Sequence, residues 1–209
     1  MKNILAALVI PLLLGFAAPA QAETAIVAGG CFWCVESDMD HIKGVTGTIS
    51  GYAGGTMDAP TYENHEGYQE AVKVTFDPAV ISYKMLIARF LRTIDVTDDG
   101  GQFCDRGESY FTGLYPIGEA QRQAATEALA EAEKSLGQKI VTPIHERTSF
   151  FPAEDYHQNY YLGENRVLSR FGIVKQKDAY HDYRKGCGRD ERVKQVWGKQ
   201  AYTDGIGGG

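Results

Sequence analysis

The hydrophobic pattern of the chain changes period several times, and the first change falls at a pair of glycines. Residues 25–28 form a short apolar run that ends at Gly29 and Gly30. Apolar residues then recur at helical spacing, at Phe32, Val35, Met39 and Ile42. Gly44 follows Lys43 and suits the left-handed cap that ends many helices. The pattern predicts a strand, a tight turn and a helix.

The next segment predicts two strands separated by a loop. Residues 45–52 have the composition of a strand. Residues 56–67 are polar, and their apolar positions follow neither the helical nor the strand period. Residues 70–76 alternate along the chain and stop at Asp77-Pro78, which is typical of a turn. We therefore expect strands at 45–52 and 70–76, with a loop between them.

Helices and strands continue to alternate toward the C-terminus. Ser82 is expected to cap a helix that turns Met85, Leu86, Phe90 and Ile94 toward the core. The other expected elements are a long loop at 95–108, a strand at 110–117, a helix at 119–136 (with Ala125, Leu129, Ala132 and Leu136 in register), a strand at 140–148 and a short aromatic helix at 152–161. This order predicts an α+β fold, a two-layer, ferredoxin-like mixed sheet with helices packed on it and long active-site loops.

The N-terminal segment resembles a secretory signal. A basic Lys2 precedes an apolar run, and Ala20-Gln21-Ala22 matches a cleavage site. A membrane anchor is the alternative, but Pro11 interrupts the run and the run is short for a span. We expect residues 1–22 to be a cleaved signal peptide and residues 23–209 to be one domain, located in the periplasm or secreted, with no attachment to the membrane after cleavage.

Charge and cysteine content restrict the function classes. The chain has 21 Lys and Arg against 27 Asp and Glu, a formal net charge of −6, which argues against nucleic-acid binding as a main function. Four cysteines remain after signal cleavage: Cys31, Cys34, Cys104 and Cys187. In an oxidising compartment they permit two structural disulfides, so a small exported binding module without catalysis is one hypothesis.

Cys31 is the leading candidate for chemistry. It lies at the predicted start of a helix, where unpaired N–H groups and the helix dipole favour a thiolate and lower its pKa. Gly29 and Gly30 beside it would let a substrate approach the sulfur. Three hypotheses compete: a C-x-x-C thiol-disulfide pair of Cys31 and Cys34, a zinc site that lacks a second close ligand pair, and a nucleophilic Cys31 assisted by the other cysteines.

Several motifs, in order, resemble the peptide methionine sulfoxide reductases of the A type. They are Gly30-Cys31-Phe32-Trp33 with Glu36, residues 51–55 (GYAGG), residues 60–62 (PTY), residues 69–72 (QEAV) with 76–78 (FDP), and residues 150–159 (FFPAEDYHQN). The motifs run from Gly29 to Trp197, nearly the whole predicted mature chain. Cys34, residues 102–107 (QFCDRG) and residues 186–190 (GCGRD) resemble one branch of that family.

The resemblance implies a role for individual residues. Cys31 would attack the sulfur of the S epimer of methionine sulfoxide, and Glu70 would protonate the oxygen if burial raises its pKa. Tyr62 and Tyr110 would hydrogen-bond that oxygen, with Asp105 beside them. Phe32 and Trp33 would receive the terminal methyl group. For His157 we weigh a supporting role in the site against a structural hydrogen bond.

The resemblance also implies a redox cycle and its partners. Cys31 would become a sulfenic acid that forms a disulfide with Cys187, with Cys34 as the rival. The substrates would be oxidised proteins and small methyl sulfoxides, and the reductant a thioredoxin-like protein of the envelope. We expect a monomer that binds no metal, flavin or nicotinamide. A thiol-disulfide oxidoreductase using Cys31 and Cys34 is the alternative enzyme.

Overall fold

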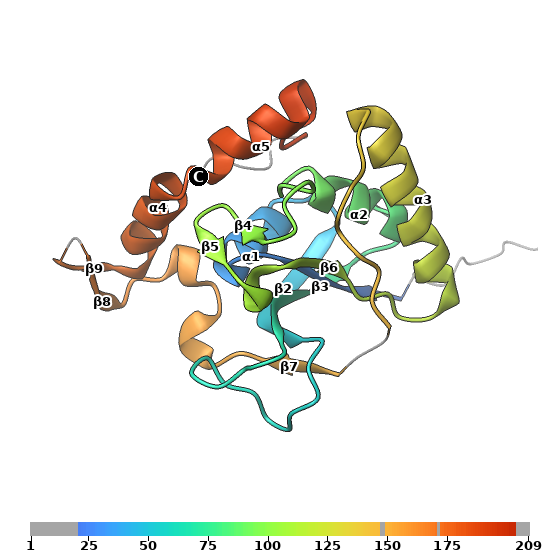
Figure 1. Ribbon diagram of the computed structural model, residues 1–209. Helices are drawn as coiled ribbons and strands as arrows, with labels where there is room; N and C mark the ends of the chain where they lie inside the picture. Colours follow the sequence, from blue (N-terminus) through green and yellow to red (C-terminus); the bar gives the residue numbers. More distant parts are fainter. Residues whose placement is uncertain (1–20, 147–148, 171, 204–209) are drawn as a thin grey trace, which may run out of the picture.

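A five-stranded sheet lies at the centre of the computed structural model, which describes residues 21–146, 149–170 and 172–203 (Figure 1). Its strand order is β6-β1-β3-β2-β7. The strands are β1 (Glu23–Gly29), β2 (Val45–Ala53), β3 (Gln69–Phe76), β6 (Thr112–Leu114) and β7 (Phe150–Pro152). Strand β3, which carries Glu70, therefore lies in the middle of the sheet.

The order of elements confirms the predicted α+β, ferredoxin-like fold. The chain runs β1, α1 (Phe32–Asp40), β2, β3, α2 (Tyr83–Leu91) and β6, which is the βαββαβ succession. The sheet itself is antiparallel in all four of its ladders and not mixed as expected. The reason is that β3 inserts between β1 and β2 and runs opposite to both.

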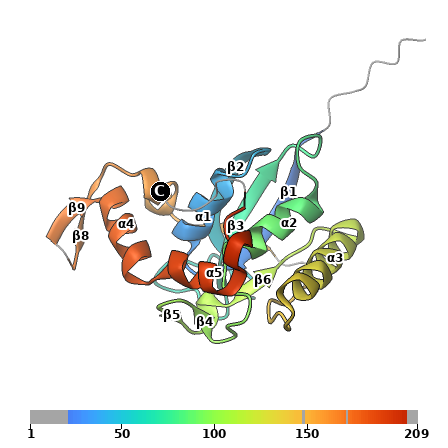
Figure 2. The same cartoon turned by 90° about the horizontal axis from the view of Figure 1, so that it is seen from above.

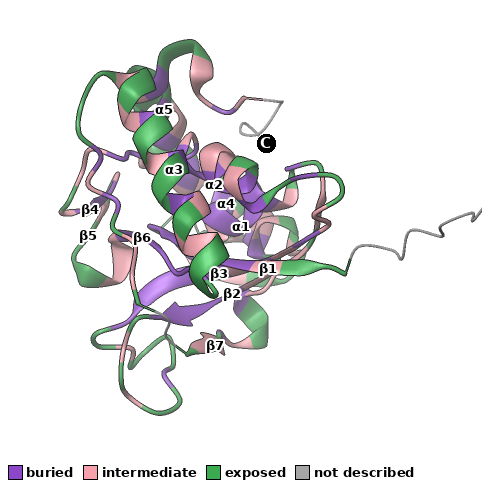
Figure 3. Ribbon diagram, turned by 90° about the vertical axis from the view of Figure 1, so that its right-hand side faces the viewer, coloured by how far each residue is buried: buried purple, intermediate pink, exposed green. Residues whose placement is uncertain are grey.

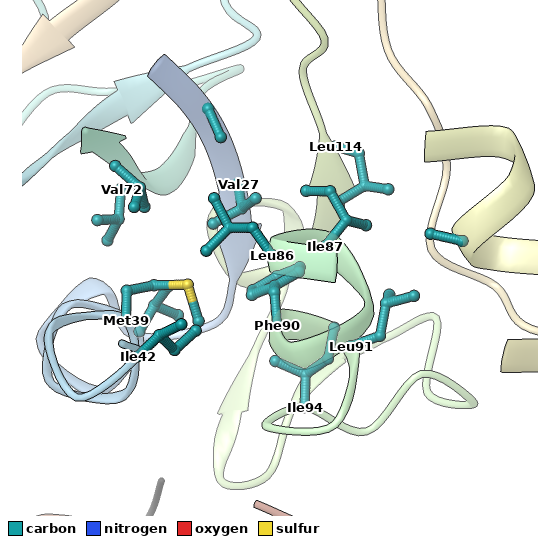
Figure 4. Close-up of a cluster of buried hydrophobic side chains, with 14 of the residues drawn as sticks. Val27, Met39, Ile42, Val72, Leu86, Ile87, Phe90, Leu91, Ile94 and Leu114 are labelled. Atoms are coloured by element: carbon teal, nitrogen blue, oxygen red, sulfur yellow. The ribbon is translucent and has the colours of Figure 1, made fainter. Parts of the chain in front are cut away.

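The main core lies between the sheet and the helices α1 and α2. Figure 4 shows its side chains converging from these elements: Val27, Val72 and Leu114 from the sheet, Met39 and Ile42 from α1 and the turn after it, and Leu86, Ile87, Phe90, Leu91 and Ile94 from α2 and its end. All of these are buried. The core fixes both α1 and β3, the two elements that supply Cys31 and Glu70 to one place.

Helix α3 (Glu119–Leu136) covers α2 from the outside. Its buried side chains are Ala125, Ala128 and Ala132, and its outer face is polar and exposed (Figure 3). Leu129 and Leu136, which were expected to be buried, are only partly so. Small alanines at the contact let the two helices approach closely, because little side-chain volume separates their backbones.

Two helix predictions need correction. Met85 was expected in the core but is half exposed, because the buried face of α2 runs through Tyr83, Leu86, Ile87, Phe90 and Leu91 and leaves Met85 beside it. The aromatic segment 152–161 is not an α-helix. It contains two 3₁₀ turns, Asp155–His157 and Tyr160–Leu162, with Asn159 between them in the left-handed region.

The strand predicted at 140–148 is wrong over its described part. Ile144 makes one isolated bridge with Leu114, and residues 147 and 148 lie outside the described residues. The strand predicted at 110–117 is shorter than expected, because only Thr112–Leu114 pairs with the end of β1. The predicted loop at 95–108 contains a small hairpin of β4 (Gly101–Gln102) and β5 (Asp105–Arg106).

The C-terminal region adds elements that the hydrophobic pattern did not predict. A hairpin of β8 (Arg166–Ser169) and β9 (Gly172–Lys175) projects at the left of Figure 1 and leads into α4 (Gln176–Gly186). Helix α5 (Arg189–Trp197) follows, and the two helices lie in succession along one side of the molecule (Figure 2). They supply further side chains to the site.

The predicted signal peptide, 1–22, lies almost entirely outside the described residues. Within residues 21–146, 149–170 and 172–203, no helix is both long enough and apolar enough to cross a bilayer.

Candidate active site

Cys31 lies at the turn between β1 and α1 and is the cap residue of the helix. Its carbonyl oxygen accepts hydrogen bonds from the N–H groups of Cys34 (3.1 Å) and Val35 (3.2 Å). The glycines before it serve the protein's own packing. A Cβ on Gly30, whose φ is +81°, would lie 2.6 Å from the Cβ of Gln102, and one on Gly29 would lie 2.8 Å from Ile94. The role expected for them, opening a path for substrate, is therefore corrected.

Glu70 lies against the first turn of the same helix. Its Oε2 accepts a hydrogen bond of 2.9 Å from the backbone N–H of Phe32. The side chain is 2% exposed, and burial raises its pKa to about 8, although the hydrogen bond from Phe32 opposes the shift. Glu70 is therefore protonated at neutral pH, as a proton donor must be.

The expected lowering of the Cys31 pKa is wrong. Burial raises the pKa of Cys31, and the interaction with Cys34 and the charge of Asp105 act in the same direction. The physical reason is that Cys31 is buried, at 7% exposure, and that Glu70 accepts the hydrogen bond from the first N–H of the helix. The hydrogen bond from Cys31 lowers the pKa of Cys34, and the charges of Arg189 and Arg184 favour that thiolate too.

A small pocket opens over the Cys31 sulfur. Its volume is about 60 Å³. Seven of its lining residues are those that the family resemblance implied, and Tyr183 of α4 is an addition: Cys31, Phe32, Trp33, Tyr62, Glu70, Asp105, Tyr110 and Tyr183. The pocket thus combines a thiol, a protonated carboxyl group, several phenols and two aromatic rings, which suits a small polar group attached to an apolar one.

The phenols in the pocket are hydrogen-bond donors at neutral pH. Burial raises the pKa of Tyr62 to about 12 and raises that of Tyr110 further. The hydroxyl of Tyr183 donates to Oδ2 of Asp105, which fixes that carboxylate at the edge of the pocket. Burial raises the pKa of Asp105, while the Tyr183 hydrogen bond opposes the shift. An oxygen atom between Tyr62 and Tyr110 would accept two O–H donors.

His157 holds the Trp33 ring in place. Nε1 of Trp33 donates to Nδ1 of His157 at 3.1 Å, and the Trp33 ring stacks on Tyr160 with centroids 3.8 Å apart. Burial lowers the pKa of His157 to about 4, so it is a neutral acceptor at Nδ1. His157 is absent from the pocket lining, and the geometry favours orientation of Trp33 over contact with a ligand.

Cys187 is not next to Cys31 in this structure. It forms a disulfide with Cys104, with a Cα–Cα distance of 5.0 Å, and Cys31 and Cys34 are both free thiols. Cys31 and Cys34, in contrast, lie in the same buried cluster. Cys31 caps α1 and Cys34 lies three positions further along, in its first turn.

Sequence reasoning missed three residues near the thiols: Tyr183, Arg184 and Arg189. Both arginines are buried and bind Asp38 of α1, at 2.9 Å and 3.2 Å. Their helices have mostly polar sequences, so hydrophobic periodicity gave no signal. The GCGRD motif between the helices was the available clue. Across residues 21–146, 149–170 and 172–203, no group of His, Cys, Asp and Glu is arranged to hold a metal ion.

The chain resembles known proteins over most of its length. The family model described as "Peptide methionine sulfoxide reductase" matches residues 23–200. A relative named peptide methionine sulfoxide reductase MsrA 2, from Rhizobium meliloti (strain 1021), is 46% identical over 186 residues, which is 88% of this chain and 88% of the relative. One of the same name from Caulobacter vibrioides is 45% identical over 194 residues, covering 88% and 92% of the two chains.

Solved structures agree with this assignment. Methionine sulfoxide reductase A of Corynebacterium diphtheriae superposes with a TM-score of 0.63 at 28% identity, covering 73% of this chain and 83% of that one. Mxr1 from Saccharomyces cerevisiae in reduced form gives 0.62 at 29% identity, covering 68% and 86%. With the sequence motifs, the pocket and these similarities in agreement, the chain belongs to the peptide methionine sulfoxide reductase family.

Proposed function

We propose that this protein reduces the S epimer of methionine sulfoxide, free or within proteins, with Cys31 as the nucleophile and Glu70 as the acid. The observation that carries the proposal is the placement of a free thiol and a protonated, buried carboxyl group on one small pocket. Oxygen transfer from sulfur to sulfur needs both, because the sulfoxide oxygen leaves its sulfur only when a proton is supplied.

The geometry suits the following sequence of events. The methyl group of the substrate packs on Phe32 and Trp33, and its oxygen accepts hydrogen bonds from Tyr62 and Tyr110. The Cys31 proton passes to the neighbouring Cys34, and the Cys31 thiolate attacks the sulfoxide sulfur. Glu70 protonates the oxygen. The S–O bond of the substrate and its new bond to Cys31 then break as the hydroxyl passes to the Cys31 sulfur, which releases the thioether and leaves a sulfenic acid. The Cys31 sulfur is thereby oxidised by two electrons and the substrate sulfur is reduced by two.

Epimer selection has a geometric basis in this pocket. The pocket lining contains both proton donors for the oxygen, from Tyr62, Tyr110 and Glu70, and aromatic rings for the methyl group, from Phe32 and Trp33. A chiral sulfur can direct both groups to their sites in only one of its two configurations when the nucleophile approaches from Cys31. This supports selection of a single epimer, which we take to be S.

The test is a steady-state assay with each pure epimer and dithiothreitol. We expect methionine from the S epimer only, and background rates for Cys31→Ser, because a serine hydroxyl is scarcely ionised at neutral pH. The alternative thiol-disulfide oxidoreductase has less support, since it would not need the acid and the phenols. Methionine produced by Cys31→Ser at the wild-type rate, or reduction of protein disulfides without any reduction of sulfoxide, would overturn the proposal.

The cellular setting is a proposal as well. The Ala20-Gln21-Ala22 motif after an apolar segment supports export to the periplasm or the medium. An exported reductase has no access to cytosolic thioredoxin, so we propose a thioredoxin-like dithiol protein of the envelope as reductant and a monomer as the working form. Fractionation of cells that produce the untagged full chain tests the location, and the protein remaining in the cytosol would contradict it.

A further inference from the structure

Three consecutive residues of the β4–β5 hairpin contact the last turn of α4, the junction after it and the first residue of α5. The ring of Phe103 lies 4.7 Å from the guanidinium of Arg189, Cys104 forms the disulfide with Cys187, and Asp105 accepts the hydrogen bond from Tyr183. The hairpin and the two helices lie side by side in both views (Figure 1, Figure 2). Residue numbers rise along the hairpin as they fall along the C-terminal segment, so the two segments run antiparallel to each other.

Only one of these three contacts lies at the pocket. Asp105 and Tyr183 line it, whereas Cys104 and Cys187 do not. Cys104 is exposed at the surface, and the disulfide joins residues that are 83 positions apart in sequence. A disulfide between segments that are distant in sequence stabilises a protein mainly by restricting the conformations of the unfolded chain. The disulfide therefore holds the two pocket residues together from outside.

The catalytic thiol already has a closer partner. Cys34 is 2% exposed, packs in the same buried cluster as Cys31 and lies near the charges of Arg184 and Arg189. Those arginines are held by Asp38 at 2.9 Å and 3.2 Å, so their positions are set by the fold. A thiolate next to Cys31 is what a sulfenic acid needs in order to be resolved.

We infer that the Cys104–Cys187 disulfide is a lasting clasp of the substrate pocket, and that the redox cycle uses Cys31 and Cys34 alone. This inference rests on the proposed reductase function, and it gives Cys34 the resolving role expected above for Cys187. The Cys34 sulfur attacks the sulfur of the Cys31 sulfenic acid, the S–S bond forms, and the S–O bond breaks with loss of water once hydroxide is protonated. An external dithiol protein then reduces the Cys31–Cys34 bond and is itself oxidised to a disulfide.

The first test compares two variants with a thioredoxin-type dithiol protein as the sole reductant. Cys34→Ser should yield about one methionine per protein and then stop. The double variant Cys104→Ser/Cys187→Ser should continue to turn over, with kcat near that of the wild type and a KM raised several-fold, because Asp105 and Tyr183 are then less well held. Continued turnover by Cys34→Ser, or a stop after one or two methionines by the double variant, would overturn the inference. Absence of methionine from the wild type would instead reject the proposed function.

The second test does not depend on the folding of a variant. Wild-type protein is alkylated during turnover and mapped without reduction. We expect Cys104 and Cys187 joined in every sample, and Cys31 and Cys34 either alkylated or joined to each other. Alkylation of Cys104 or Cys187 in the working enzyme, or a Cys31–Cys187 peptide, would overturn the inference. It would show that the Cys104–Cys187 disulfide opens during the cycle and carries electrons to Cys31.

The third test asks whether the clasp acts through the pocket residues that it holds. Tyr183→Phe removes the hydrogen bond to Asp105 and should raise KM in the wild-type background. In the Cys104→Ser/Cys187→Ser background it should have a smaller effect, because contacts that act as a unit are not additive. Full additivity of the two KM effects would show that disulfide and hydrogen bond act independently, against the inference.

Discussion

At the scale of single residues, Glu70 connects the fold to the chemistry. It lies in the central strand, 2% exposed, and its Oε2 accepts the first N–H of α1. Its pKa of about 8 follows from that burial. The same contact occupies the helix N–H group that would have lowered the pKa of Cys31. One hydrogen bond therefore affects the pKa of both the acid and the nucleophile.

Glu70→Gln should lower the rate of sulfoxide reduction by about 10²-fold or more, the usual scale for loss of a positioned acid. Glutamine keeps the shape and can accept the Phe32 N–H but cannot supply the proton. The measurement is single-turnover formation of methionine from the S epimer. The matched control is Glu36→Gln, since Glu36 is also fully buried with a pKa raised to about 7 but lies outside the pocket. Equal rates for the two variants would exclude Glu70 as the acid.

Glu70 should also affect stability in a pH-dependent way. Its pKa is about 8 in the folded protein against 4.5 for a glutamate side chain exposed to water. The folded state therefore keeps a proton that the unfolded state releases, so the stabilisation by this proton is complete below pH 4.5 and is lost as the pH rises to about 8. Each pH unit in that window costs at most about 1.4 kcal/mol, and the Glu70→Gln variant, which has no proton to release, avoids this loss.

The melting temperature of Glu70→Gln should accordingly rise relative to that of the wild type between pH 5 and pH 8. Paired thermal unfolding curves over this range check the trend. A difference in melting temperature that is independent of pH would show that Glu70 is ionised in the folded protein.

At the scale of elements, the turn between β1 and α1 has the strictest steric requirement. Gly30 has a φ of +81°, and a Cβ there would lie 2.6 Å from the Cβ of Gln102, which is fully buried. Gln102 is itself fixed by hydrogen bonds to the backbone of Asp95, at 2.9 Å and 2.8 Å. The hairpin that carries Asp105 therefore rests directly on the turn that carries Cys31.

Gly30→Ala should destabilise the protein by more than the roughly 1 kcal/mol expected from a positive φ alone. Gly67→Ala is the matched control, because Gly67 has a φ of +77° and an added Cβ would meet no atom within 4 Å. Urea unfolding of both variants gives the comparison. Equal losses of unfolding free energy would mean that Gln102 yields to the new side chain without cost.

Elements with a clear hydrophobic period could be predicted from sequence, and others could not. The β2, β3, α2 and α3 segments were found close to their expected bounds. Helix α1 was also predicted, but it ends at Asp40 with His41 as its cap and does not extend to the cap expected at Gly44. The described residues 140–146 were misassigned because Ile140 and Ile144 join the core without forming a regular ladder. Residues 152–161 were misassigned because their aromatic residues pack on the site, as Tyr160 does on Trp33, without α-helical backbone. Among the site residues, the pocket members came from motifs, whereas Tyr183 lies in a polar helix whose packing depends on buried ion pairs.

At the scale of the whole molecule, those ion pairs join the C-terminal helices to the core. Asp38 of α1 binds Arg184 of α4 and Arg189 of α5, and all three side chains are buried. Arg184 also binds Asp190 at 2.6 Å. These arginines lie near Cys34 and lower its pKa. Asp38 therefore both holds the C-terminal helices on the core and positions the charges that favour the Cys34 thiolate.

Asp38→Asn should lower the free energy of unfolding by about 3 kcal/mol, because loss of one partner leaves buried charge uncompensated. Glu131→Gln, which removes an exposed partner of Lys84, should change it far less, because water screens that pair. Denaturant unfolding of both variants checks this. A loss for Asp38→Asn no larger than that of the surface variant would show that the arginines are satisfied without Asp38.

A single turnover without reductant shows whether Cys31 itself takes up the oxygen of methionine sulfoxide. Protein with free Cys31 and Cys34 is mixed with excess methionine sulfoxide of each epimer, and methionine and disulfides are quantified by mass spectrometry. We predict about one methionine per protein from the S epimer, none from the R epimer, and oxidation of Cys31 in step with the product. Absence of methionine from the S epimer, or its formation while Cys31 stays a free thiol, would contradict the account.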